Sequence, residues 1–333
     1  MDREQDELQF LGLFGIFKES FKIIYKWRKI FSQITLTLIL PLSFIFLAHL
    51  EISDILLLRI SRNENALYET RSTDDKARKK RISDVITSEW ATFWLFKAAY
   101  LTLMLIFGLL STSAVVYTIA CIYTAREITF RKIMSVVPRV WKRVMVTFLC
   151  TFLAFFLYNV VAIVVLMICL VLTFNSDSGV IITFFLLILY VVGFVYMTII
   201  WQLASVVSVL EEVRGIKAMV KSKKLLKGNM WVATIIFVIL IVFSVVLQYS
   251  FQILVVLERT FGTVGRLAYG ILCLLLLLML ILFALVIHTV LYFVCKSYHH
   301  ENIDKSALSD HLEVIYLGDY VPLKSKDVQL EQV

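Results

Sequence analysis

The sequence has 333 residues, of which 60% are hydrophobic and only 17% are charged, and its formal net charge is +8. Soluble domains carry nearer a quarter charged residues, and they lack repeated apolar runs of about 20 residues. This composition excludes a water-soluble globular domain and indicates an integral membrane protein.

Six apolar segments are long enough to cross a bilayer as helices. Each can span a hydrocarbon core of about 30 Å at a rise of about 1.5 Å per residue. The segments are Phe31–Leu50, Phe93–Tyr123, Val144–Phe174, Gly179–Leu210, Trp231–Leu257 and Leu267–Val294. We therefore expect an all-α membrane protein with six transmembrane helices.

A basic segment precedes the first span. Phe14, Phe17 and Phe21 recur at helical spacing, while Lys22 and Lys26 lie on another face. Such a pattern is typical of an amphipathic helix on a membrane surface, with its basic residues near anionic headgroups. The first ten residues, MDREQDELQF, are polar and acidic and do not resemble a cleavable signal peptide.

A second basic segment precedes the third span. Its apolar face is formed by Ile133, Val136, Val137, Val140 and Val144. The opposite face carries Arg139, Lys142 and Arg143. This segment also predicts an amphipathic surface helix.

The third basic segment, GIKAMVKSKKLLKGNMW at 215–231, has five lysines and no acidic residue. Ile216, Met219 and Val220 share one face. The neighbouring basic residues are Lys217, Lys221 and Lys224. We expect a third surface helix, and the alternative for all three segments is an ordinary basic loop.

The three basic segments share a pattern that predicts a repeat. Each places a serine six to nine residues before a tryptophan at the entrance to a span, as in Ser20 and Trp27, and each is followed by two apolar spans. We therefore predict three repeats of a cytosolic amphipathic helix plus a transmembrane hairpin.

The distribution of lysine and arginine orients the chain, because cytosolic loops are enriched in both. The basic segments before spans one, three and five are expected in the cytosol, together with both termini. The connection at 52–89 is then non-cytosolic, although it contains the basic run KARKKR. The alternative is a re-entrant first segment bent at Pro41. The expected regions are a cytosolic amino terminus (1–30), a membrane domain (31–295) and a cytosolic tail (296–333).

Residues 201–233 resemble the repeat signature of the glycerophosphodiester phosphodiesterase membrane-domain group, in which an acidic residue ends a span and a Ser, Leu, Gly and Trp run enters the next. The matching residues are Glu211 or Glu212, Gly215, Ser222, Leu226, Gly228 and Trp231. The segment IFKESFKIIYKWRKIF is similar to the opening element of that group, and the whole chain resembles a plant family of six-span proteins of unknown function. The catalytic barrel of the phosphodiesterases has no counterpart here, so the resemblance implies a fold and no catalytic residue.

Few polar side chains fall within the spans. Asn159, Gln202, Gln248 and His288 are the candidates for an intramembrane polar site, and hydrogen bonds between helices are the alternative explanation for them. The Glu211–Glu212 pair is expected to pair with Lys217 or Lys221.

The tail contains YVPL, in which Tyr320 and Leu323 fit the form of a tyrosine-based sorting signal, a form that also arises by chance. From these features we expect a non-enzymatic multi-pass protein of the endomembrane system (ER) or plasma membrane, which organises protein partners or lipids at the cytosolic surface. The alternative is a carrier of a small amphipathic solute through a site between the three hairpins. Expected partners are anionic lipid headgroups and an unidentified protein, with no nucleic acid, metal or cofactor.

Overall fold

The computed structural model describes residues 11–70, 76–124, 128–173, 178–257 and 262–299. Throughout these ranges the regular elements are helical and no strand occurs, which confirms the all-α fold class. The described residues contain six helices long and apolar enough to cross a membrane, which confirms the predicted number of spans. The helices are Arg28–Glu69, Arg78–Tyr123, Phe130–Leu172, Gly179–Leu210, Met230–Leu257 and Thr263–Tyr298.

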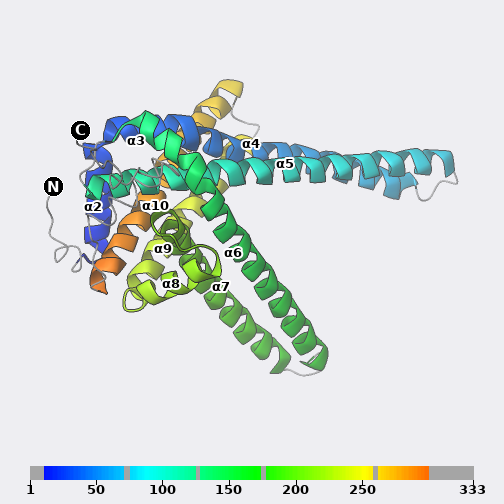
Figure 1. Cartoon of the computed structure of the whole chain (residues 1–333). Helices are drawn as coiled ribbons and strands as arrows, with labels where there is room; N and C mark the ends of the chain where they lie inside the picture. The colour runs from blue at the N-terminus through cyan, green and yellow to red at the C-terminus, as the bar shows by residue number, and fades with distance from the viewer. Residues whose placement is uncertain (1–10, 71–75, 125–127, 174–177, 258–261, 300–333) are drawn as a thin grey trace, which may run out of the picture.

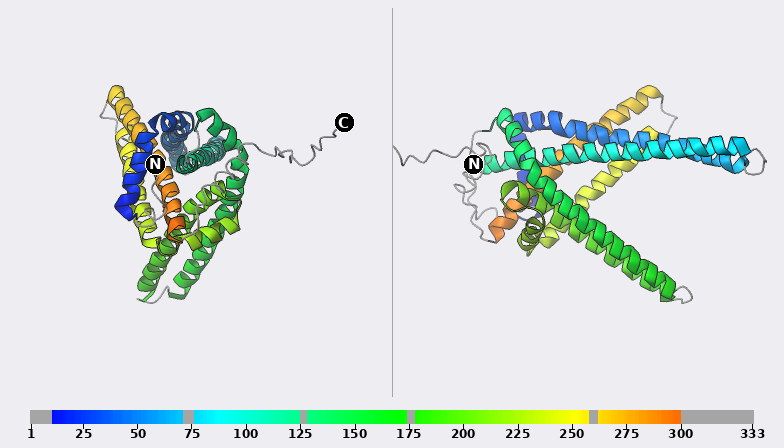
Figure 2. Two further views of the ribbon diagram at one scale, coloured as in Figure 1. Left: turned by 60° about the vertical axis from the view of Figure 1, so that its left-hand side comes forward. Right: turned by 45° about the vertical axis from the view of Figure 1, so that its right-hand side comes forward.

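The long helices form three hairpins that diverge from a shared region, here called the base (Figures 1 and 2). The first hairpin joins α4 (Leu40–Thr70) to α5 (Lys76–Tyr123), and the second joins α6 (Phe130–Thr173) to α7 (Ser178–Leu210). The third joins α9 (Met230–Phe251) and its extension η2 (Gln252–Leu257) to α10 (Thr263–Tyr298). Two short helices, α2 (Leu13–Lys26) and α8 (Ile216–Leu226), lie at the base.

The first span is one continuous helical rod. The helix α3 (Arg28–Ile34) leads through a π-helical stretch, η1 (Thr35–Ile39), directly into α4. Proline has no N–H and its ring crowds the preceding turn, so the π-helix just before Pro41 absorbs a local defect without ending the rod. A re-entrant hairpin bent at Pro41, the alternative drawn from the sequence, is therefore wrong.

The first hairpin is much longer than its apolar part. The helix α5 has 48 residues and spans about 72 Å, more than twice a hydrocarbon core of about 30 Å. The segment at 52–89, expected as a connection, is helical over 52–70 and 76–89. Charged residues thus extend the hairpin as a helical pair beyond its apolar portion.

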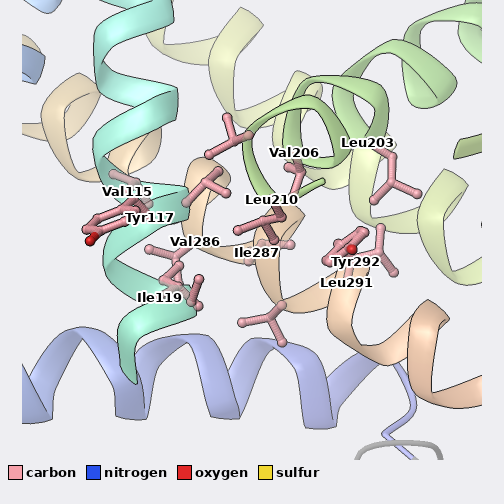
Figure 3. Packing of buried hydrophobic residues seen from close by; sticks show 14 of the residues in the cluster. Val115, Tyr117, Ile119, Leu203, Val206, Leu210, Val286, Ile287, Leu291 and Tyr292 are labelled. Atoms are coloured by element: carbon pink, nitrogen blue, oxygen red, sulfur yellow. The ribbon is translucent and has the colours of Figure 1, made fainter. Parts of the chain in front are cut away.

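The main core lies at the base, where α5, α7 and α10 meet (Figure 3). Val115 and Ile119 from α5 pack with Leu210 from α7 and with Val286 and Tyr292 from α10, and each is 3% exposed or less. The base therefore has the tight apolar packing of a folded core.

The short helix α2 packs against α10 mainly through residues other than the phenylalanines that define the predicted apolar face. Ile16, Ser20 and Ile23 are buried, whereas Phe14 and Phe21 are 86% and 66% exposed. Phe14 and Phe21 thus remain on the molecular surface. Phe17, from the same predicted face, is partly buried and packs against Phe283 of α10, with ring centroids 5.8 Å apart, beside the buried stripe that holds α2 to the protein.

The second basic segment is not a separate surface helix, contrary to expectation. It forms the first turns of α6, which runs without interruption from Phe130 to Thr173. The predicted face of Ile133, Val136, Val137, Val140 and Val144 does exist, but every member is buried in the base at 2% exposure or less. The three basic segments therefore differ in structure, and the threefold repeat stays a prediction.

The third hairpin rests against the first through a smaller apolar cluster. Leu47 of α4 packs with Phe251, Val255, Cys273 and Leu277. At the edge of this contact, Arg266 pairs with Glu51 at 3.4 Å.

Candidate functional site

A largely buried carboxylate joins three helices at the base. Glu211, the residue after α7, accepts a hydrogen bond of 2.6 Å from the Tyr292 hydroxyl of α10. Lys221 of α8 lies 2.6 Å from the other carboxylate oxygen, and Lys296 of α10 lies 3.2 Å from the first. The Glu211 side chain is only 12% exposed. The predicted pairing of the acidic pair with α8 is therefore confirmed for Glu211 and Lys221.

Opposing effects act on the Glu211 carboxyl. Burial alone would raise its pKa, but the hydrogen bonds from Lys221 and Tyr292 and the charge of Lys296 outweigh burial and hold the pKa below its ordinary value. Glu211 is therefore an anion at neutral pH and fixes the basic helix α8 against α7 and α10.

Two glycines of the same signature allow the chain to turn at either end of α8. Gly215 has a φ of 64° and donates its N–H to the Thr147 hydroxyl of α6 at 2.9 Å. Gly228 has a φ of 99°, and a Cβ there would lie 2.6 Å from the Tyr298 ring of α10. Both positions need a left-handed backbone, which glycine adopts without steric cost.

The remaining residues of the signature differ in exposure. Ser222 is fully buried and donates its hydroxyl proton to the Ile200 carbonyl of α7 at 2.8 Å. Leu226 is 1% exposed, whereas Trp231 is 79% exposed at the start of α9. Most of the signature thus builds the corner between α7, α8 and α9, and this explains why residues of these types occur together.

The predicted lipid-contact residues all belong to elements at the base. Those with exposed side chains are Lys22, Lys26, Arg139, Lys142, Lys217 and Lys224. Arg143 is partly buried, and Lys221 is engaged by Glu211. The network around Glu211 therefore orients α8 so that Lys217 and Lys224 remain on the surface.

The four predicted intramembrane polar residues do not form one site. Asn159 accepts a hydrogen bond of 2.8 Å from the Tyr190 hydroxyl and so links α6 to α7. Gln248 donates to Ser244 of its own helix at 3.1 Å. Only Gln202 and His288 come together, because both line a cavity between α5, α6, α7 and α10.

This central cavity has a volume of about 370 Å³. Its polar lining includes Trp201, Gln202 and Ser205 of α7 and His288 of α10, and apolar side chains form most of the wall. The Nε2 atom of His288 is buried and has no hydrogen-bond partner in the described part of the chain. Among the same residues, no group of three or more His, Cys, Asp or Glu side chains is placed to hold a metal ion.

Sequence reasoning missed a polar cluster in the first hairpin. Lys97 of α5 lies 2.6 Å from His49 Nε2 and donates to the Ser53 hydroxyl at 3.1 Å. His49 also stacks on Tyr100, with ring centroids 3.7 Å apart. His49 and Lys97 are equally far along the chain from residue 73. An antiparallel pairing of α4 with α5, with its turn at that residue, would have predicted that the two side chains lie side by side.

The sorting-signal residues Tyr320 and Leu323 lie outside the described residues. Comparison with protein families gives one match, to a model described as a domain of unknown function (DUF8558), over residues 1–333. The chain belongs to this family. No curated protein and no solved structure matches it.

Proposed function

We propose that this DUF8558 protein is a non-enzymatic multi-pass membrane protein that organises lipids or protein partners at the cytosolic surface of the ER or plasma membrane. Its base would face the cytosol with both termini, and its three hairpins would cross the membrane. We also propose that the plant six-span proteins and the phosphodiesterase membrane domains share this architecture.

The network around Glu211 carries the proposal. It holds a basic helix rigidly beside two spans, and it uses only one of the lysines of α8 to do so. The exposed Lys217, Lys223 and Lys224 remain at the surface. Each basic residue near an anionic membrane contributes about 1 kcal/mol of attraction, so a fixed group of them favours anionic headgroups or an acidic partner.

The second hairpin supports the same function. Its apolar side chains are exposed on both helices, including Phe152 at 63% and Leu189 at 67%. In the described chain, no other hairpin covers its outer half (Figure 2). Lipid or a membrane partner must therefore cover this surface.

The experiment places the full-length protein in nanodiscs of mixed neutral and anionic lipid and measures energy transfer to a labelled anionic lipid. Replacing Lys217, Lys223 and Lys224 together with glutamine should reduce the enrichment of anionic lipid, more at low salt than at high salt. The matched control replaces Lys76, Lys79 and Lys80 at the start of α5 and removes the same charge at the far end of a hairpin. Equal effects of the two triple variants would contradict the proposal.

A carrier of a small amphipathic solute is the second candidate, and one observation favours it: Gln202 and His288 come from different helices to line the same cavity. Saturable uptake into proteoliposomes that is lost in Gln202→Leu, in a protein that still folds, would replace the scaffold with the carrier.

A further inference from the structure

The cavity between α5, α6, α7 and α10 has a wall that restricts what it can hold. Its lining contains no lysine, arginine, aspartate or glutamate. An ionised group placed there would lose its hydration without gaining a counter-charge, which is strongly unfavourable. Any occupant is therefore uncharged.

The apolar part of the wall is extensive. Leu105 and Leu109 of α5 and Ile281 and Leu285 of α10 all line the cavity. The volume of about 370 Å³ lies within the range of ligand pockets, about 300–1,000 Å³, and far exceeds the space that one water needs. Cavities lined by such side chains favour hydrocarbon over water.

The polar part of the wall is small, and one of its buried atoms has no hydrogen-bond partner among the described residues. This atom is Nε2 of His288. The Gln202 side chain lines the same cavity. The Ser205 hydroxyl donates its proton to the main-chain carbonyl of Gln202 at 2.7 Å, so the hydroxyl oxygen remains available as an acceptor. A buried polar atom such as His288 Nε2 normally has a partner. The His288 ring lines the cavity, so a rotation of the ring would bring Nε2 to a ligand that supplies one.

We propose that this cavity binds a neutral single-chain amphiphile, with a hydroxyl or carbonyl head group hydrogen-bonded to His288 and Gln202. Its hydrocarbon chain lies between the leucines and isoleucine of α5 and α10. This binding goes beyond the scaffold function and does not depend on it. The carrier candidate requires such binding, whereas the binding requires no transport.

Gly108 offers a way to fill the cavity. It lines the cavity, and a Cβ added there would meet no atom within 4 Å. Gly270 has the same open surroundings but lines a different cleft, between α4, η2 and α10. Gly108→Leu and Gly270→Leu are therefore a matched pair in which only the first obstructs the cavity.

The test uses diazirine-bearing hexadecanol as a probe with the full-length protein in neutral nanodiscs, and mass spectrometry locates the cross-links. We expect competable labelling within 104–116, 201–206 and 281–288. Gly108→Leu should lower it at least about tenfold by excluding the chain, and His288→Leu should lower it about fivefold by removing one hydrogen bond. Gly270→Leu and Gln248→Leu should leave it unchanged.

The head group provides a further test with the unmodified protein. Unlabelled hexadecanol should compete better than hexadecanoate at pH 8 or hexadecane, because the first alone is both neutral and able to form hydrogen bonds. Equal competition by all three, absence of cross-links in the cavity, or labelling unaffected by Gly108→Leu would each overturn the proposal and leave a cavity that holds water or bulk lipid. Loss of anionic-lipid enrichment in the α8 triple variant, with hexadecanol labelling intact, separates this inference from the scaffold.

Discussion

The base and the second hairpin are built from similar apolar residues but are held together in different ways. At the base, side chains such as Ile119, Leu210 and Val286 exclude solvent from all sides, and Glu211 ties α8 to two spans. In the outer half of the second hairpin, α6 and α7 contact mainly each other, with hydrogen bonds among Tyr158, Asn159 and Tyr190. The difference indicates that the contacts that stabilise the fold are concentrated at the basic end of the molecule. The outer parts of the hairpins remain exposed to lipid or protein partners.

The largest expected effect comes from the centre of the base. Glu211→Gln removes the negative charge that Lys221 and Lys296 share. Because both lysines keep some contact with solvent, the loss should lie below the range for fully buried pairs, at about 2–3 kcal/mol of the free energy of unfolding. Unfolding of the detergent-solubilised protein, followed by circular dichroism, measures the loss. The exposed Asp84→Asn makes the same change of charge in the first hairpin and should stay within about 0.5 kcal/mol of the wild type. Similar losses in both variants would remove the distinction between base and hairpins.

The turn after α8 should show the next largest effect. Gly228→Ala forces a Cβ against the Tyr298 ring at a φ of 99° and should cost about 1–3 kcal/mol. Gly270→Ala, in an open position on α10, serves as the control and should be neutral or slightly stabilising. An unchanged stability of Gly228→Ala in the same unfolding assay would show that the corner does not depend on its glycine.

Acidification should weaken the base by a smaller amount. Because the folded pKa of Glu211 lies below its ordinary value of 4.5, its contribution is complete above that pH and is lost as the pH falls through the folded pKa. The free energy of unfolding of the wild type should therefore decline faster below pH 4.5 than that of Glu211→Gln. Parallel pH curves for the two proteins would show that the carboxylate does not stabilise the fold.

The smallest effect is expected in the second hairpin. Asn159→Leu removes the hydrogen bond from Tyr190, and such bonds between membrane helices contribute about 0.6 kcal/mol on average. Recovery of protein partners from membranes should be unchanged, while unfolding shifts slightly. A loss as large as that of Glu211→Gln would mean that the hairpin, like the base, is part of the cooperative core.

The sequence predicts the number of spans because only length and apolarity are needed for that. It does not predict which apolar stripe touches protein, because lipid accepts the same side chains. In α2 the phenylalanines at 14 and 21 are exposed while Ile16 and Ile23 are buried, and in α8 Ile216 is exposed while Ala218 is buried. The face of Ile133 and its neighbours was found correctly, but periodicity gave no sign that it belonged to the core.

Only part of the candidate site could be predicted from the sequence, for a related reason. The Glu211–Lys221 pair joins neighbouring elements and follows from their spacing, whereas Tyr292 and Lys296 arrive from a helix about 80 positions away in the chain. Gln202 and His288 were identified as polar residues in spans, but only the packing of α7 against α10 shows that these two line the cavity and that Asn159 and Gln248 do not.

The proposed orientation, in which the basic base faces the cytosol while the hairpins cross the membrane, can be measured directly. Lys217→Cys on α8 and Lys80→Cys on α5 are placed singly in a background without the native cysteines, in sealed vesicles with the cytosolic face outward, and treated with a maleimide that cannot cross membranes. We expect immediate labelling of the first variant and labelling of the second only after permeabilisation. Labelling of both variants before permeabilisation would contradict this orientation.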